Sequence, residues 1–293
     1  MNKILVTGAT GALGSATLQA LLQRRDATDL IAMVRDPEKA VWLEAQGVEV
    51  RRGDYFDTSS LSSAFEGVET VMMVSAVAFT DRLAQHLNVI QTAKQAGVRR
   101  LVYTSIQRKH SSGHVISMVT EDDIATEQAL ADSGLEYTVL RNCLYQEALP
   151  YMLGPDWING LQTTVGDGRA PIVSRSDLAL ANAIILTQPG HEDKTYTLGA
   201  SESVSFRDMA VTLEQVIGRE IPYQVVPKLA ITQRLTATGF PAAAADFLHD
   251  WIEAVNVGEF EEVTGDLERL IGRRPISCLE FIAAHYRDVE WAR

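Results

Sequence analysis

Two patterns of hydrophobic residues alternate through the first 150 residues of the chain. Short apolar runs, many of them rich in β-branched residues, are separated by stretches in which apolar residues recur every three or four positions. Most of the short runs are apolar at successive positions, which is typical of strands covered by helices on both faces. We predict strands at residues 4–6, 30–34, 48–50, 71–74, 101–103 and 137–140.

The intervening stretches have the spacing and the end signals of helices. Alternation of strands and helices with short connections predicts parallel pairing through right-handed crossovers. The fold class is therefore α/β, with a doubly wound, Rossmann-like parallel sheet. The first two helices are indicated by a leucine stripe in 13–25 and by an N-cap at Asp57 with a stop at Gly67. The next two are indicated by a stripe of Leu83, Leu87 and Ile90, and by the capping-box spacing of Thr120 and Asp123 at the start of a helix at about 118–133.

The composition of the chain changes after residue 150, where prolines and glycines become frequent. Helical spacing returns at 176–187, 206–217, 242–255 and 276–286. We interpret residues 1–150 as the first domain. Residues 151–293 are then a smaller, mostly helical domain that covers the open face of the first, and some of its segments return to the first domain.

Composition excludes several classes of protein. The 293 residues are 46% hydrophobic and carry a formal net charge of −12, without the basic face that a general nucleic-acid binder needs. Two cysteines make no disulfide framework, and Cys143 reads as a small buried filler. The longest uncharged apolar stretch, 71–80, is far shorter than the ~20 residues that span a bilayer. We expect a soluble cytoplasmic protein that binds neither nucleic acid nor membrane.

Three glycines spaced three apart follow the first predicted strand and precede the first helix. In this context Gly8 permits a tight turn, Gly11 lets the backbone approach a diphosphate, and Gly14 lets the helix pack closely on the strand. The free N–H groups at the helix start favour an anion there. The predicted diphosphate site comprises Gly8, Ala9, Thr10, Gly11, Ala12, Leu13 and Gly14.

The loop TGATGALG resembles the glycine motif of extended and atypical short-chain dehydrogenases/reductases. Segments 32–40, 53–55, 103–105, 137–142 and 176–179 are similar to the NmrA-like branch of that family. Within the branch, the likeness is greatest to bacterial NAD(P)H:quinone oxidoreductases of type 2 and triphenylmethane reductases. It covers about residues 3–290, and it implies an NADPH-dependent oxidoreductase.

The residue after the second strand distinguishes NADH from NADPH, because an acid there binds the ribose 2′-OH and a base binds a 2′-phosphate. Here Arg35 follows the strand directly, and a guanidinium grips phosphate through two hydrogen bonds. Asp36 would favour NADH, but Asp36-Pro37-Glu38 also has the pattern of a helix start. We predict NADPH, as the resemblance also implies.

Ligands of doubly wound sheets bind at the carboxyl ends of the strands. Ordinary capping of strand ends is the alternative role for polar residues there. The further cofactor contacts that we predict at these ends are Asp54, Ser75, Ala76, Thr104 and Asn142.

Typical short-chain reductases use a Tyr and a Lys four residues apart to protonate a carbonyl. None of the eight tyrosines here has Lys at that spacing, and Asp123 stands where isoflavone-reductase-like enzymes carry a Lys. The resemblance implies that quinone and triphenylmethane reductases also work without the pair. Our catalytic candidates are Ser105, His114 and Tyr145, with Gln107 and His110 nearby and 110–114 as a loop that could close as a lid. No metal-ligand spacing occurs.

The favoured function is NADPH-dependent hydride transfer to a quinone or another flat conjugated acceptor, a small molecule, by a monomer or homodimer. Two alternatives stay open. One is a non-catalytic sensor that binds NADP(H) and regulates a partner, which the missing Tyr/Lys pair also suits. The other is a pathway-specific reductase or isomerase, in which residues 106–120 select a different metabolite.

Overall fold

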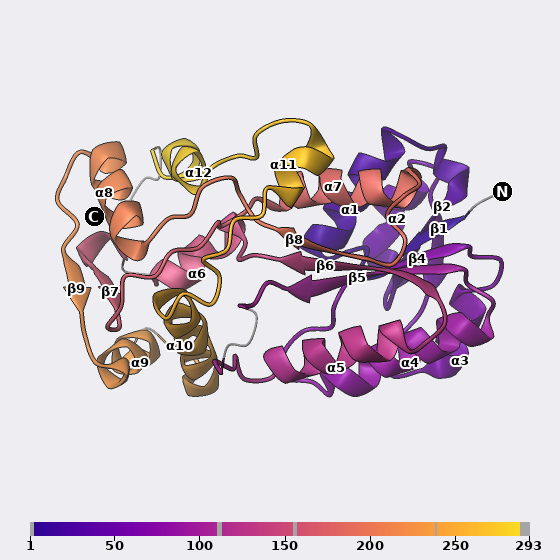
Figure 1. Cartoon of the computed structure of the whole chain (residues 1–293), viewed down its shortest axis with the longest axis horizontal. Coiled ribbons are helices and arrows are strands. Elements are labelled where there is room, and N and C mark those ends of the chain that lie inside the picture. The colour runs from indigo at the N-terminus through magenta and orange to yellow at the C-terminus, as the bar shows by residue number, and fades with distance from the viewer. Residues whose placement is uncertain (1–2, 110–112, 155–156, 238, 288–293) are drawn as a thin grey trace. The chain divides into compact units, whose positions relative to one another are not determined.

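The computed structural model describes residues 3–109, 113–154, 157–237 and 239–287 (Figure 1). The chain forms two units, and neither is contiguous in sequence. The first comprises Met1–Ile106, Met118–Asn142 and Arg175–Thr197. The second comprises Gln107–Ser117, Cys143–Ser174 and Leu198–Arg293. The chain thus enters the second unit first at residue 107, well before the glycine-rich region begins.

A seven-stranded sheet forms the centre of the first unit, with the strand order β3-β2-β1-β4-β5-β6-β8. Strands β1 to β6 pair in parallel, which confirms the six predicted strands. The edge strand β8 was not predicted, because its sequence KTYTL is polar and half exposed and lacks a continuous apolar run. The strands are β1 (Ile4–Val6), β2 (Leu30–Val34), β3 (Glu49–Arg52), β4 (Thr70–Met73), β5 (Arg100–Ile106), β6 (Glu136–Asn142) and β8 (Lys194–Leu198).

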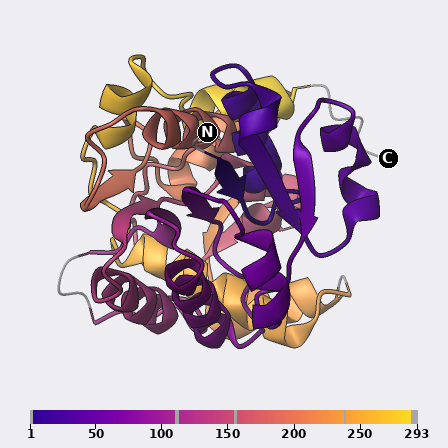
Figure 2. The same ribbon diagram turned by 90° about the vertical axis from the view of Figure 1, so that its right-hand side faces the viewer.

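Helices cover both faces of this sheet (Figure 1). On one face lie α3 (Thr58–Ala64), α4 (Arg82–Gln95) and α5 (Thr120–Ala131), and on the other lie α1 (Ala12–Leu22) and α7 (Arg175–Thr187). Figure 2 shows the early, indigo and purple part of this unit nearest to the viewer. Helices α1 and α7 pack together, and the Asn182 amide donates a buried hydrogen bond of 3.0 Å to Thr17 Oγ1. Short helical turns connect the remaining elements: Ala27–Asp29, Pro37–Ala40 and α2 (Val41–Glu44).

The core on the α3, α4 and α5 face confirms part of the sequence prediction and corrects part of it. Asp57 caps α3 as predicted, since its Oδ1 accepts from Ser59 N–H and Ser60 N–H. The predicted leucine stripe of α4 was wrong, because Leu87 is 40% exposed and only Ile90 of the three is buried. The buried face of α4 instead includes the polar residues Arg82, Gln85 and His86.

The predicted capping box at the start of α5 was also wrong. The helix begins at Thr120, after Val119, and no side chain caps it. Asp123 is fully buried and pairs with Arg82 and Tyr103, so its carboxylate does not return to the helix end. Asp123 therefore contributes to the buried core of the unit instead of capping the helix.

The second unit is mostly helical, as predicted for the later part of the chain. Its two-stranded sheet pairs β7 (Leu161–Thr163) with β9 (Tyr223–Val225) in parallel. Helix α10 packs on α9 and α12 packs on α8. Cys143 and Cys278 are buried free thiols whose pKa values are raised by burial. The helices are α6 (Leu149–Leu153), α8 (Phe206–Ile217), α9 (Lys228–Ala237), α10 (Ala242–Asn256), α11 (Asp266–Ile271) and α12 (Cys278–His285), with short turns at Gln146–Ala148 and Trp157–Asn159.

Within the described ranges no helix combines the length and apolar character that crossing a bilayer requires.

Candidate functional site

The strand order reverses between β1 and β4, which are neighbours at the centre of the sheet. In open α/β sheets, ligands bind outside the carboxyl ends of the strands at such a reversal. The glycine loop follows β1, and the segment 74–76 follows β4. The two loops that flank the expected crevice are therefore both part of the predicted site.

The glycine loop has the geometry that its spacing predicts. Gly8 has a φ of +57°, in the region that favours glycine, and its carbonyl accepts from Gly11 N–H at 2.8 Å. A β carbon on Gly14 would lie 2.3 Å from that carbonyl oxygen, so only glycine fits where the helix meets the strand. Gly8, Thr10, Gly11 and Ala12 are exposed, whereas Ala9, Leu13 and Gly14 are buried.

The start of α1 suits an anion. Gly11 is the N-cap residue, with no side-chain cap, and the first turn contains no acidic residue. The first N–H groups of a helix lack partners within the helix, and the macrodipole adds partial positive charge there. A diphosphate supplies the acceptors and the negative charge that this terminus lacks, so the loop fits a dinucleotide.

Arg35 follows β2 directly and is exposed at the same end of the sheet. Asp36 caps the next turn by accepting from Glu38 N–H at 3.2 Å, which confirms the helix-start interpretation. Sequence reasoning missed Arg52, which ends β3 in register with Val34 and is also exposed. Because β2 and β3 pair in parallel, the two arginines lie at the carboxyl ends of neighbouring strands. The sequence feature that could have indicated Arg52 is its position as a basic residue at the end of the third strand.

Side chains from several elements hold the backbone that follows β4. Thr7 Oγ1 accepts from Val74 N–H and Thr104 Oγ1 from Ser75 N–H, both at 2.9 Å. Tyr55 donates to the Val74 carbonyl at 2.8 Å. Thr104 therefore holds the backbone of Ser75, and Ser75 with Ala76 continues a wall that begins at Val74, next to Gly8.

A buried polar network anchors the same wall at Ala76. His86 Nε2 accepts from Ala76 N–H at 2.9 Å, and Arg82 Nη1 donates to the Ala76 carbonyl at 2.6 Å. Behind them, Tyr103 donates to Asp123 Oδ1 at 2.5 Å, and Arg82 pairs with the same carboxylate. Burial raises the pKa of Tyr103 well above its usual value, so the phenol stays a donor.

His86 is held in its neutral form. Burial, and to a smaller extent the charge of Arg82, lowers its pKa to about 3. Its Nε2 accepts a backbone hydrogen bond, and its Nδ1 contacts Thr126 Oγ1 at 2.9 Å, with the Tyr103 hydroxyl 3.4 Å away. An imidazolium could not accept the bond from Ala76, so the wall depends on the neutral ring.

This gives an expected pH dependence of stability. The unfolded chain takes up a proton at His86 near pH 6.5 and the folded chain only near pH 3. The contribution of His86 is therefore complete above about pH 6.5 and is lost as the pH falls towards 3. Urea titrations give the free energy of unfolding of wild type and of H86Q. The difference between the two should become smaller as the pH falls from about 6.5 towards 3. Parallel pH profiles would contradict the expectation, and the His86 NMR signal should not titrate above about pH 4.

The remaining sequence-predicted residues of the first unit lie at the carboxyl ends of their strands. Asp54 is half-buried, and its Oδ1 accepts from Phe56 N–H at 2.9 Å, which shapes the turn after β3. Asn142 ends β6 and is buried. Ser105, near the end of β5, donates to Glu127 Oε1 at 2.6 Å. Glu127 was not predicted, because its partners come from two strands distant in sequence.

The other catalytic candidates belong to the second unit. His114 is half-buried in the segment after β5, and Tyr145 forms an isolated bridge with Val173. The Gln107 amide donates to the carbonyls of Phe260 and Glu262 at 3.1 and 2.8 Å, so it anchors its own segment. His110 and the centre of the predicted lid lie outside the described residues. His114 and Tyr145 stay predictions.

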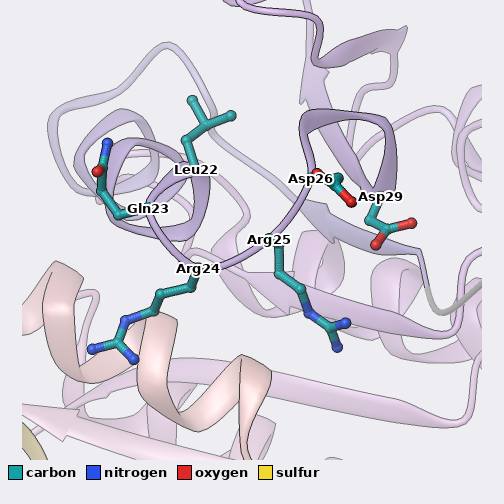
Figure 3. A pocket seen from close by; sticks show the side chains of 6 residues that line it. All are labelled: Leu22, Gln23, Arg24, Arg25, Asp26 and Asp29. Carbon is teal, nitrogen blue, oxygen red and sulfur yellow. The ribbon is translucent and has the colours of Figure 1, made fainter.

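A pocket of about 420 Å³ lies elsewhere in the first unit, between the end of α1 and the start of β2 (Figure 3). Figure 3 shows the Arg24 and Arg25 side chains diverging from one another, with Asp26 and Asp29 on the side of Arg25. The pocket is at the amino end of β2, whereas the glycine loop and Arg35 follow carboxyl ends. It is not part of the candidate site.

Comparison with known proteins agrees with this geometry. The chain is 34% identical over 290 residues to quinone oxidoreductase 2 of Escherichia coli (strain K12), covering 98% of this chain and 99% of that protein. The crystal structure of the E. coli NADPH-dependent quinone oxidoreductase with NADPH matches with a TM-score of 0.89 at 34% identity, over 96% and 99% of the two chains.

Triphenylmethane reductase of Citrobacter sp., crystallised with NADP(H), also matches with a TM-score of 0.89 at 34% identity, over 97% of this chain and 100% of that one. NAD(P)H azoreductase of Xenophilus azovorans is 27% identical, over 96% and 97% of the two proteins. The model of the NmrA-like family matches residues 1–290. The chain therefore belongs to the NmrA-like family.

Proposed function

We propose that this chain is an NADPH-dependent oxidoreductase that reduces a quinone or another flat conjugated acceptor. The observation that carries the proposal is the glycine loop and uncapped α1 terminus at the strand-order reversal, which fit a dinucleotide diphosphate. Relatives similar over nearly the whole chain, a quinone oxidoreductase and a triphenylmethane reductase, were crystallised with NADPH and NADP(H). These relatives support both the cofactor and the acceptor class.

The protein's contribution is orientation. NADPH, when bound, supplies the hydride, so the chain has to hold the dinucleotide and exclude water. The N–H groups of Ala12 to Gly14, in the first turn of α1, would bind the diphosphate, and Arg35 with Arg52 would face the 2′-phosphate. The wall at Ser75 and Ala76 would limit the cofactor on the side of β4. Helix α5 carries Asp123 and Glu127 and contains neither Tyr nor Lys, so a Tyr/Lys pair on it has no part in the mechanism.

The preference for NADPH gives an expected result for Arg35. R35A should raise the Kd for NADPH about 10- to 100-fold, the range expected for charged hydrogen bonds, and leave the Kd for NADH unchanged. R24A is the control, since Arg24 is also an exposed arginine but precedes the amino end of β2. Calorimetry with both cofactors gives the measurement. An equal loss of affinity for NADH and NADPH would contradict the role of Arg35.

The function is tested by mixing the NADPH complex with a panel of quinones and with a triphenylmethane dye in a stopped-flow instrument. Loss of the 340 nm absorbance of NADPH is expected with at least one acceptor. Binding of NADPH without oxidation by any of them would favour the sensor. Absence of NADPH binding would overturn the proposal entirely.

A further inference from the structure

The Tyr55 side chain reaches from the loop after β3 to the strand-order reversal. Its hydroxyl donates to the Val74 carbonyl at 2.8 Å and contacts Thr7 Oγ1, which accepts from Val74 N–H at 2.9 Å. Thr7 follows β1 and Val74 follows β4, whereas Tyr55 follows β3 at the edge of the sheet. One side chain therefore connects loops that lie two and three strands apart in the order β3-β2-β1-β4.

The directions of these hydrogen bonds follow from the number of protons. A carbonyl oxygen only accepts, so the single proton of Tyr55 is donated to Val74. The Thr7 hydroxyl accepts from Val74 N–H, and its own proton is therefore donated to the Tyr55 oxygen. Burial raises the pKa of Tyr55, which keeps the phenol protonated. The three residues form a closed ring in which every proton has an acceptor.

Tyr55 is also fixed at its backbone. Its carbonyl accepts from the Asn88 amide of α4 at 2.9 Å, and its side chain packs against the core on the α3, α4 and α5 face. Asp54, which the sequence predicts as a cofactor contact, directly precedes it. The loop that carries Asp54 is consequently joined to the backbone at Val74.

Val74 in turn borders the glycine loop. A β carbon on Gly8 would lie 3.5 Å from Val74 Cβ, so the two residues lie directly beside one another. The next two N–H groups, of Ser75 and Ala76, are also bound by buried side chains. Because segment 74–76 lies beyond the end of β4, these side chains fix its distance from the glycine loop. A site that is held in its binding form loses less conformational freedom when the ligand enters.

We infer that Tyr55 is a positioning residue that fixes the width of the cofactor crevice, so that NADPH enters a site already formed in the free protein. The inference rests on the proposed function, because it takes NADPH as the ligand. Removing the Tyr55 hydroxyl takes away the donor to the Val74 carbonyl and the acceptor of the Thr7 proton. Val74 then has to be brought into position during binding, which lowers the affinity and adds a step to association.

The experiment follows NADPH binding to the full chain by stopped-flow fluorescence. Wild type should bind in one phase, whose rate rises linearly with the NADPH concentration. Y55F and T7V should raise the Kd for NADPH about tenfold, the size expected for one buried hydrogen bond. Both should also add a slower phase whose rate levels off at high NADPH concentration. T7S keeps the hydroxyl of the ring and should bind like wild type.

T7V/Y55F should bind NADPH no more weakly than either single variant, because loss of one member opens the ring. T138V is the matched control, since Thr138 is fully buried on β6, accepts from Arg100 Nη2 and donates to the His191 carbonyl, each at 2.7 Å. It should lower the urea midpoint as T7V does and keep wild-type NADPH binding. Additive losses in the double variant, wild-type binding by Y55F, or weakened binding by T138V would overturn the inference. Failure of wild type to bind NADPH would overturn the proposed function instead.

Discussion

Replacing Gly14 with alanine is expected to weaken NADPH binding by about 100-fold, the upper range for the strain of an overpacked site. The new β carbon would lie 2.3 Å from Gly8 O, 2.8 Å from Gly8 C and 3.0 Å from Thr7 O. All three are backbone atoms, so no side chain can rotate away. The loop must shift, and α1 must move from the strand that aligns its first N–H groups with the diphosphate.

The measurement is the Kd for NADPH by fluorescence, with thermal melting to establish that the variant is folded. G134A is the control, because Gly134 has a φ of +80° and its β carbon would meet nothing within 4 Å. That variant should cost about 1–2 kcal/mol of stability through backbone strain alone, with an unchanged Kd. Wild-type NADPH affinity in G14A would contradict the structural role of this glycine.

Replacing Arg82 with methionine is expected to have the largest effect on stability. It leaves the buried Asp123 without its cation, and breaking one side of a buried ion pair costs about 3–5 kcal/mol. It also removes the donor to the Ala76 carbonyl, so the wall beside the glycine loop loosens and NADPH affinity falls.

Urea unfolding followed by circular dichroism measures the loss. R99M is the matched control, since Arg99 pairs with Glu69 and Glu136 at the surface, where such pairs are worth about 1 kcal/mol or less. A second variant, R82M/D123L, should recover much of the stability, because it removes both charges. An R82M variant as stable as R99M would show that Asp123 does not need this partner.

The sequence was sufficient for the parts of the fold that depend on local pattern. Continuous apolar runs mark strands buried on both faces, and Asp57 caps its helix through neighbouring N–H groups, so both were predictable. The glycine loop was predictable for the same reason. The tight turn, the space for a diphosphate next to the backbone and the packing of the helix on the strand all depend on residues 8–14. The edge strand β8 was missed because half of it faces solvent and an exposed strand has no apolar run.

Contacts between distant segments could not be predicted. Nothing near Asp123 in the sequence indicates Arg82 or Tyr103, and capping-box spacing was a reasonable but wrong explanation of that carboxylate. Glu127 could not be predicted for the same reason. Its carboxylate contacts Ser105 on β5 and Arg141 on β6, and only the register of these two strands brings the two residues together. The predicted leucine stripe of α4 was wrong because polar residues occupy part of the buried face of the helix. Arg82 and His86 lie there and form hydrogen bonds with the backbone of Ala76, after β4.

The interleaving of the two units has a consequence for synthesis of the protein on the ribosome. Helix α7, which packs on α1, and β8, which completes the sheet, lie within residues 175–198, after the chain has already contributed segments to the second unit. The growing chain cannot complete the nucleotide-binding unit until this segment has emerged. A chain released at residue 150 would leave the α1 face without α7, so truncation there should yield an aggregation-prone product instead of a separable domain.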